Sequence, residues 1–402
     1  MRLVPGAAAR AGHGAGRAGH GAARAGHGAG RAGHGAGRPV GCALTSPSSF
    51  PRPTADEQPL HGTPLAAWTT LGVGGEAAEL LVARERDQLC EAVARADAQG
   101  RPVLLLGGGS NVVVGDGGFD GLVVRVGVEG EREQEDGDGS VLVRVGAGVS
   151  WDDFVRRCLA EGLAGVECLV GVPGLVGATP VQNVGAYGQE VAEVVEAVQA
   201  WDRARGQLVV LQARECAFGY RDSLFKRSDR YVVTEVVFRL TRSGTAKPLR
   251  YPELARALGA VVGDRPPCSE VAAAVLALRR SKGMVIGPGE QASRSVGSFF
   301  VNPVLGEAEV RLLDRRFPGA PRFPAPGGTK VPAAWLVEAC GFHKGYRRGR
   351  AAVSSRHALA LVALDGARAA DVVDLAREVR DGVAGRTGVV LQPEPRLVGC
   401  QL

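Results

Sequence analysis

The 402-residue sequence predicts an α+β protein of two lobes. Short apolar runs alternate with segments of helical periodicity from about residue 60 onward, as in α/β and α+β folds. The length is enough for two or three domains. Composition changes near Ser243–Lys247, which marks the expected domain boundary. We therefore expect a tail and linker at 1–58, a first domain at 59–243 and a second at 244–402.

The individual elements follow from periodicity and from their end signals. Leu89, Val93 and Ala96 share one face of a predicted helix that ends at Gly100. Ser150 opens an S-x-x-D capping pattern before another apolar face. The acidic segment Glu129–Gly139 is expected to be a solvated hairpin loop. Strands are predicted at 102–106, 112–114, 122–126, 141–145, 208–211 and 231–240, and helices at 84–99, 150–162, 269–280, 306–315, 331–340 and 368–382.

Charge and composition exclude several classes of protein. The formal net charge is +6, but residues 1–52 hold seven arginines and no acid, so the remainder carries −1 and nucleic-acid binding is not expected. No apolar run reaches the ~18 residues that span a bilayer, and no secretory signal is visible, so a cytoplasmic protein without membrane insertion is expected. The eight cysteines form no C-x-x-C pair, which predicts reduced thiols and no metal site.

The N-terminal segment 10–37 repeats a seven-residue Arg/Gly/His unit four times. The repeat places His13, His20, His27 and His34 at one position of the unit, which leaves open a metal-binding or anion-binding tail. The unit has no large apolar residue to bury, and its glycines oppose a helix. We favour a disordered extension, which a wrongly assigned start codon would also explain.

Two glycine-rich segments are suited to holding a cofactor. In Leu106–Asn111, a strand leads into G-G-G-S-N, where backbone N–H groups can approach a phosphate closely. Neither a Rossmann nor a P-loop pattern fits, and a tight hairpin is the alternative. Val170–Gly188 combines five glycines and two prolines, too many for a regular helix or strand. Loops this long are usually functional, and a flat cofactor could run past this one.

Three shorter motifs carry candidate chemical groups. Phe218–Lys226 contains Arg221, whose planar fork suits a carboxylate; a surface ion pair with Asp222 is the alternative. Ser298 follows a glycine and precedes two aromatic residues, where a turn or cap role is the alternative. Glu394 stands between two prolines, which fix its direction; a solvated acid is the alternative.

These five segments, in this order, resemble the UDP-N-acetylenolpyruvoylglucosamine reductase family of flavoenzymes, type I subgroup. The resemblance runs from about Thr69 to Leu402, and the joint occurrence of the motifs is highly specific. It implies an FAD-binding lobe of the vanillyl-alcohol-oxidase (PCMH) type, which needs no Rossmann motif, and a C-terminal α/β substrate-binding lobe.

The resemblance also assigns roles to residues. Arg221 and Glu394 match active-site residues, and Ser298 matches the proton donor. Tyr251, Lys282 and Asn302 match substrate-binding residues, although Lys282 lies several residues further from the serine than expected. Val301 stands where some members have Lys. The cofactor-binding residues implied are Gly107, Gly108, Gly109, Ser110, Asn111, Gly171, Pro173, Gly174, Gly177, Ala178, Gln182, Asn183, Gly185, Ala186 and Tyr187.

The reaction implied is reduction of UDP-N-acetyl-enolpyruvoylglucosamine to UDP-N-acetylmuramate, with noncovalent FAD, NADPH as co-substrate and a monomeric enzyme. Arg221 with Glu394 would stabilise the enolate-like state, and Ser298 would supply the proton. Two alternatives stay open. One is another flavin oxidoreductase of this fold, such as a 2-hydroxy-acid or sugar-lactone oxidase; no His lies between His61 and His343 for the histidyl linkage common there. The other is a non-enzymatic flavin carrier or binding module.

Overall fold

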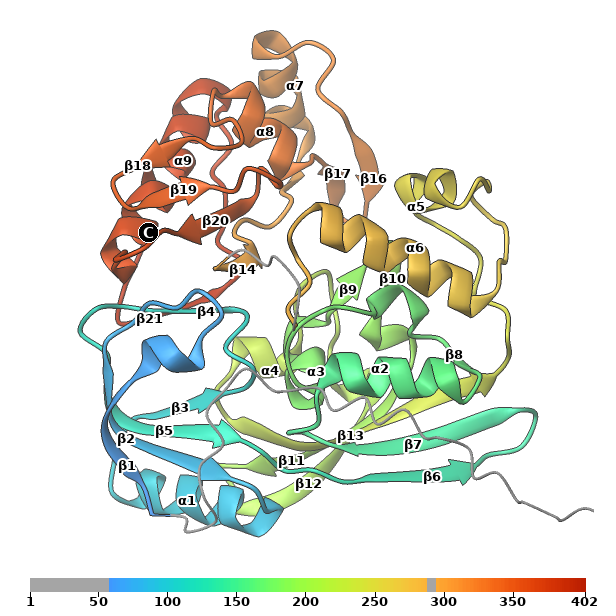
Figure 1. Ribbon diagram of the computed structural model, residues 1–402, viewed down its shortest axis with the longest axis vertical. Coiled ribbons are helices and arrows are strands. Elements are labelled where there is room, and N and C mark those ends of the chain that lie inside the picture. The colour runs from blue at the N-terminus through green and yellow to red at the C-terminus, as the bar shows by residue number, and fades with distance from the viewer. Residues whose placement is uncertain (1–57, 288–293) are drawn as a thin grey trace, which may run out of the picture. The chain divides into compact units, whose positions relative to one another are not determined.

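The computed structural model describes residues 58–287 and 294–402. The predicted tail and its histidine repeat lie outside the described residues. No helix in the described ranges is long and apolar enough to cross a membrane. The strands form several sheets with helices packed beside them. Figure 1 shows the N-terminal strands in blue and the C-terminal elements in orange and red.

A small sheet opens the described chain. Its strand order is β1 (Leu60–Pro64), β2 (Glu76–Ala83), β5 (Phe119–Val126) and β3 (Val103–Leu106). β2, β5 and β3 run parallel, and helix α1 (Arg86–Ala98) connects β2 to β3. The apolar face of α1 predicted from Leu89 and Val93 is buried in the core. This sheet brings the C-terminal end of β3 to the G-G-G-S-N turn.

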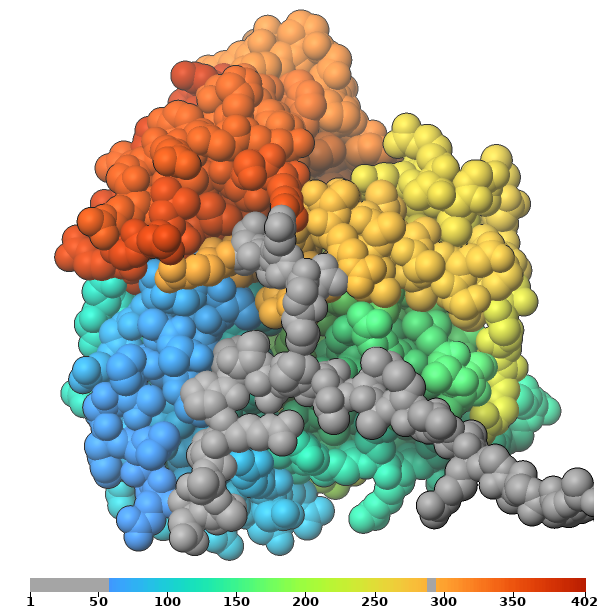
Figure 2. Space-filling view, in the orientation of Figure 1, coloured from blue at the N-terminus to red at the C-terminus, as the bar shows by residue number. Residues whose placement is uncertain are grey.

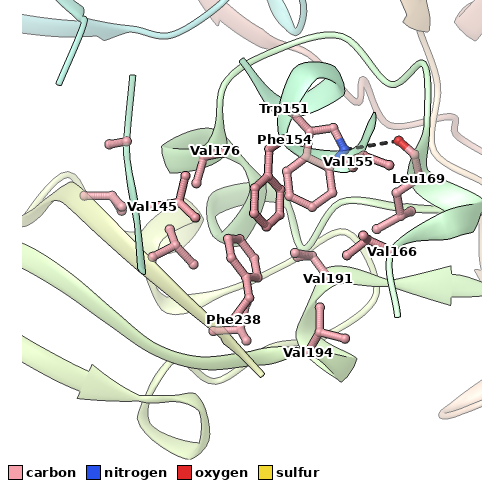
Figure 3. Packing of buried hydrophobic residues seen from close by; sticks show 14 of the residues in the cluster. Val145, Trp151, Phe154, Val155, Val166, Leu169, Val176, Val191, Val194 and Phe238 are labelled. Atoms are coloured by element: carbon pink, nitrogen blue, oxygen red, sulfur yellow. Dashed lines mark hydrogen bonds between the residues drawn. The ribbon is translucent and has the colours of Figure 1, made fainter. Parts of the chain in front are cut away.

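A larger antiparallel sheet follows. Its order is β12 (Gln207–Gln212), β11 (Val195–Asp202), β13 (Tyr231–Arg242), β7 (Ser140–Gly146) and β6 (Glu131–Glu135), with β8 (Leu163–Ala164) also paired to β13. Helix α2 (Trp151–Ala160) begins at Ser150, whose hydroxyl accepts a bond from the Asp153 N–H, as predicted. Phe154 of α2 stacks on Phe238 of β13 at 5.0 Å, and the Trp151 indole donates to the Leu169 carbonyl (Figure 3). These buried aromatic contacts fix α2 on the sheet.

One sequence expectation was wrong. The segment Glu129–Gly139 is not simply a loop, because β6 occupies Glu131–Glu135 and pairs with β7. All five residues of β6 are exposed, so the strand has no apolar alternation to signal it. Arg157 of α2 forms ion pairs with Glu131 and Glu133, which hold the charged strand at the sheet edge.

The 165–193 region contains only short elements, as its glycines and prolines predicted. Two of its non-glycine residues, Asn183 and Tyr187, have positive φ. The elements are η2 (Glu167–Leu169), η3 (Val176–Ala178), α3 (Thr179–Gln182), β9 (Gly185–Ala186), β10 (Gln189–Glu190) and η4 (Val191–Glu193). The other short elements before residue 230 are η1 (Leu65–Trp68), β4 (Val112–Val114), η5 (Ala213–Glu215) and α4 (Leu224–Arg227).

The C-terminal part forms a hydrophobic cluster around α9 that also includes Leu71, Val73 and Val113. One sheet has the order β14 (Ser295–Ser298), β20 (Ala360–Ala363), β19 (Ala351–Val353) and β18 (Arg347–Arg348), and a smaller one β15 (Val304–Leu305), β17 (Gly328–Lys330) and β16 (Phe323–Ala325). The helices are α7 (Glu307–Arg316), α8 (Ala333–Ala339) and α9 (Ala369–Thr387). The preceding α5 (Pro252–Ala257) and α6 (Cys268–Ser281) bury apolar residues in the cluster of the larger sheet.

Contacts between distant segments hold the C-terminal part against the first lobe. The last strand, β21 (Arg396–Val398), pairs in parallel with β4. Asp116 accepts bonds from the Ala369 and Ala370 N–H groups at the start of α9, at 2.8 and 3.1 Å. Figure 2 shows the orange C-terminal surface adjoining the blue strands on one side and the amber α6 on the other. The chain therefore returns to the first lobe just beyond Glu394.

Candidate active site

A cavity of about 630 Å³ lies between the two glycine-rich segments and the C-terminal sheet. Both β3 and β14 contribute walls, so residues from both predicted lobes meet there. Eleven of the predicted cofactor-binding residues line it: Gly107, Gly108, Gly109, Ser110, Asn111, Pro173, Gly177, Ala178, Gln182, Gly185 and Ala186. The cavity thus brings together two segments that lie about 60 residues apart in the sequence.

The two segments approach each other so closely that glycine is required. A Cβ on Gly108 would lie 2.8 Å from the Gly174 Cα, and one on Gly109 would overlap the Trp68 carbonyl oxygen. Gly109 also has φ +62°, which L side chains rarely adopt. The Ser110 hydroxyl donates to the Pro173 carbonyl at 3.3 Å and links the segments directly. The resulting backbone cradle fits the phosphates and flat ring of FAD, because backbone N–H groups line it without obstructing side chains.

The other four predicted cofactor-binding residues, Gly171, Gly174, Asn183 and Tyr187, do not line the cavity. Gly174 packs against Gly108, and the Gly171 carbonyl accepts a bond from Arg279. Asn183 is buried and bonds to Glu190, to the Gly219 carbonyl and to the Ala192 N–H. Tyr187 contacts the rings and charges described below rather than the cavity.

Arg221 and Glu394 form an ion pair at the cavity. The Arg221 Nε lies 3.1 Å from Glu394 Oε1, and both side chains are about one-fifth exposed. Gln182 Nε2 donates to the same carboxylate oxygen at 3.1 Å, while Arg221 Nη2 donates to the Gly185 carbonyl at 2.5 Å. Arg221 thus pairs with Glu394 rather than with Asp222, which pairs with Arg227. We call Gln182, Arg221, Ser298 and Glu394 the cavity cluster.

The backbone holds this cluster in place. Arg221 has φ +54°, a conformation that costs roughly 1 kcal/mol or more in a non-glycine residue. The Gly219–Asp222 bridge and the Lys226 ammonium, which donates to the Arg221 carbonyl at 2.9 Å, support it. Glu394 N–H donates to the Phe299 carbonyl at 2.8 Å, so Glu394 lies beside the end of β14, where Ser298 lines the cavity.

The predicted substrate-binding residues do not line this cavity. Lys282 Nζ lies 2.9 Å from Glu253 Oε2 and 5.6 Å from the centre of the Tyr187 ring. Tyr187 and Tyr251 meet edge to face at 5.5 Å. Burial raises the pKa of Tyr187 to about 12 and also raises the pKa of Tyr251, so both hydroxyls stay protonated donors. We call Tyr187, Tyr251, Glu253 and Lys282 the outer cluster.

Asn302 is separate from the outer cluster. Its Oδ1 accepts from the Ala333 N–H at the start of α8, and its Nδ2 donates to the Tyr220 hydroxyl at 3.3 Å. Tyr220 in turn faces Arg221 on one side and Lys330 on another, at 5.5 and 5.2 Å from its ring centre. Asn302 is thus linked to Arg221 through the side chain of Tyr220.

Sequence reasoning gave no role to several titratable residues near the site, among them Lys226, Arg279 and His357. Lys226 ends the Phe218–Lys226 motif but was given no role, and Arg279 lies in a predicted helix; both line the cavity. His357 is placed near Lys282 and Lys344, and burial followed by these cations lowers its pKa to about 4. Only the position of Lys226 at the end of the Arg221 motif gave a signal in the sequence.

Comparisons with known proteins agree with this geometry. Residues 77–212 match the family described as FAD binding domain, and residues 288–398 match the C-terminal domain of UDP-N-acetylenolpyruvoylglucosamine reductase. These matches confirm the predicted fold class, with an FAD-binding domain of the vanillyl-alcohol-oxidase type and a C-terminal domain of the reductase family. They also confirm FAD as the cofactor.

Relatives extend the match over most of the chain. The UDP-N-acetylenolpyruvoylglucosamine reductases of Thermobifida fusca and Salinispora arenicola are 50% and 48% identical, covering 85% and 88% of this chain and 98% and 100% of their own lengths. The crystal structure of the Thermus caldophilus enzyme superposes with a TM-score of 0.57 at 28% identity, covering 85% of this chain and 99% of its own. The chain is an FAD-dependent oxidoreductase and belongs to the UDP-N-acetylenolpyruvoylglucosamine reductase family.

Proposed function

We propose that the protein reduces UDP-N-acetyl-enolpyruvoylglucosamine to UDP-N-acetylmuramate with electrons from NADPH, in peptidoglycan precursor synthesis. The observation that carries this proposal is the position of the cavity cluster. Arg221, Ser298 and Glu394 come from three separate motifs, and all three line the cavity that the cofactor segments enclose. A flavin carrier would not need a paired Arg–Glu and a hydroxyl at this place.

The roles of the residues follow from their charges. Bound FAD supplies the hydride chemistry. Arg221, held by Glu394 and by the Gly185 carbonyl, is preorganised to stabilise negative charge that develops on the enolpyruvyl carboxylate. Ser298 delivers the proton to the carbon next to that carboxylate. A hydroxyl is a weak acid in water, but a carbanion is a strong enough base to take its proton.

We assign the outer cluster and Asn302 to the UDP portion of the substrate. Lys282 provides a point charge for the diphosphate, and the Tyr251 hydroxyl donates to it. Tyr251 is 40% exposed, so its ring is accessible from solvent. Lys282 is bonded to Glu253 in this structure, so an incoming diphosphate competes with a carboxylate already in place.

The remaining assignments are proposals of the same kind. The protein is expected to act as a cytoplasmic monomer, to hold FAD without a covalent bond, and to fold as domains 59–243 and 244–402. Among the described residues that line the cavity, none is His or Cys, which supports noncovalent binding. Acid precipitation of the purified protein should release all the flavin into the supernatant; flavin retained in the pellet would contradict this assignment.

The purified, FAD-loaded protein tests the reaction directly. NADPH oxidation should depend on the enolpyruvyl substrate, and mass spectrometry should find a product two mass units heavier than that substrate. NADPH oxidation by oxygen alone, with the enolpyruvyl sugar unchanged, would reject the proposed substrate and favour a different flavin oxidoreductase.

A further inference from the structure

The wall of the cavity carries more positive than negative side chains. Among the described lining residues the acids are Asp229 and Glu394. The bases are Arg203, Arg221, Lys226, Arg227, Arg279 and Arg396. FAD brings two negative charges in its pyrophosphate, and its reduction adds another. A lining cation that has no ion pair with a carboxylate can stabilise one of these negative charges, and its location indicates which one.

Four of these cations are already neutralised by ion pairs. The pairs are Arg203–Asp97, Arg221–Glu394, Arg227–Asp222 and Arg396–Asp229. Within the described ranges, Lys226 and Arg279 are the lining cations without an ion pair, and each donates to main-chain carbonyls instead.

The two unpaired cations lie at different places. Arg279 is 8% exposed and donates to the carbonyls of Gly171 and Met284, so its guanidinium is bound to the backbone behind the glycine-rich loop. Lys226 donates to the carbonyl of Arg221 and lines the cavity at the cavity cluster. An ammonium carries three N–H donors, and this bond uses one of them.

Opposing effects act on the pKa of Lys226, and their net result lies below the usual value for lysine. Burial lowers the pKa of Lys226, and the nearby Arg221 acts in the same direction. Glu394 and Asp222 oppose this by attracting the ammonium. Because Arg221 and Glu394 neutralise each other, Lys226 gives this end of the cavity a net positive charge.

We propose that Lys226 is the counter-cation of reduced FAD. Reduction adds two electrons and one proton to the isoalloxazine, which therefore gains one negative charge. A fixed cation at the cavity wall stabilises that charge more than the neutral oxidised ring and favours the reduced form. The inference rests on the cofactor alone and does not depend on the substrate proposed above.

A purely structural role for Lys226 predicts something different. If the ammonium only supports the strained backbone of Arg221, a neutral donor at the same place should serve as well. Lys226→Gln retains an N–H donor and removes the charge, whereas Lys226→Arg retains the charge. Lys247→Met is the matched control, since it removes one positive charge outside the cavity, where Lys247 lies 3.9 Å from Glu193.

The experiment is an anaerobic redox titration of the FAD-loaded proteins against a reference dye. For Lys226→Gln, the ratio of reduced to oxidised flavin at a given potential should fall about tenfold or more, a shift of ~30 mV or more for two electrons. Lys226→Arg and Lys247→Met should stay within about twofold of the parent. Sulfite affinity gives a second readout, because the sulfite adduct is also anionic; it should fall in Lys226→Gln by a similar factor.

Three outcomes would overturn the proposal. A parental potential in Lys226→Gln would leave only the backbone role. A parental potential combined with weaker FAD binding would assign the charge to the pyrophosphate. An equal shift in Lys226→Arg would show that position, not charge, matters. If Lys226→Gln loses FAD on purification, the same variant reconstituted with excess FAD provides the comparison.

Discussion

The cavity cluster and the outer cluster both contain a cation bonded to a glutamate, but the surroundings of the two pairs differ. Arg221 is bound by Glu394 and by backbone carbonyls, and its own backbone is in a left-handed conformation. Lys282 is bound by Glu253, a partner about one-third exposed, beside the ring of Tyr187. The first pair is fixed by several partners, whereas under the proposed assignment the second pair would have to open for a phosphate to bind.

This difference distinguishes residues suited to the chemical step from residues suited to binding a distant part of the substrate. Groups that stabilise a transition state gain most from being preorganised, because no reorganisation is then needed during the reaction. Groups that hold a distant part of the substrate can exchange one partner for another at little net cost. Changes in the cavity cluster should therefore act on the chemical rate, and changes in the outer cluster on apparent substrate affinity.

The largest effect is expected at Ser298. Ser298→Ala should leave flavin reduction by NADPH nearly intact and slow flavin reoxidation by the substrate roughly 10²–10⁴-fold, the usual loss for a positioned general acid. Ser298→Cys should recover part of the rate, because a thiol also donates a proton. Stopped-flow absorbance resolves the two half-reactions. Equal slowing of both would indicate displaced flavin, and unchanged reoxidation would leave water or Glu394 as the acid.

The environment of His357 allows the outer cluster to be probed by pH. Burial and the neighbouring cations lower its folded-state pKa from 6.5 to about 4. The unfolded state therefore binds the proton first, and stability present above pH 6.5 should be lost as the pH falls towards 4, by up to ~3 kcal/mol. His357→Gln should flatten the pH dependence of the free energy of unfolding in this window. An unchanged slope in urea titrations would show that His357 is not the group responsible.

The outer cluster itself should respond in substrate affinity. Lys282→Ala should raise the apparent KM for the UDP substrate about 10–100-fold, since a charge-assisted bond contributes about 1.5–3 kcal/mol. Tyr251→Phe should raise it less. Glu253→Gln provides the opposite test: removal of the competing carboxylate should lower KM by a few-fold. If Lys282→Ala instead lowered kcat at unchanged KM, the contrast between the two clusters would fail.

How far the sequence specified these clusters depended on how local each signal was. The glycines at 107–109 were predicted as a cofactor cradle because they follow a strand and let backbone N–H groups approach a phosphate closely, with a tight hairpin as the alternative; they line the cavity. The proximity of Arg221 and Glu394 was expected only from the resemblance and not from the residues themselves, since the pair joins positions 173 residues apart and depends on β21 returning to β4. The alternative partner, Asp222, was adjacent in sequence and misleading.

The missed elements have a similar explanation. β6 carries only charged and polar residues, so it is held by ion pairs with Arg157 that no periodicity reveals. His357 and Lys282 are 75 positions apart, and their proximity comes from the packing of separate segments. The residues of each motif were thus predictable from the sequence, whereas contacts between distant segments became visible only in the structure.

The smallest effect is expected from deleting the N-terminal tail. Unchanged activity after the deletion would confine function to the cavity cluster and the outer cluster. Every member of the two clusters lies between residues 182 and 394, and no apolar pattern in residues 1–55 predicts packing against them. Deleting 1–55 should therefore leave flavin content, kcat and KM within about twofold of the full chain, the range expected when no positioned group is lost. The four repeat histidines offer ligands for a divalent metal, so the same assays with and without Zn²⁺ serve as the control. Metal bound by the full chain but not by the deletion variant, at equal turnover, would show that the tail acts apart from catalysis. A large loss of flavin or of turnover on deletion would instead show that residues 1–55 contribute to the fold or to one of the clusters.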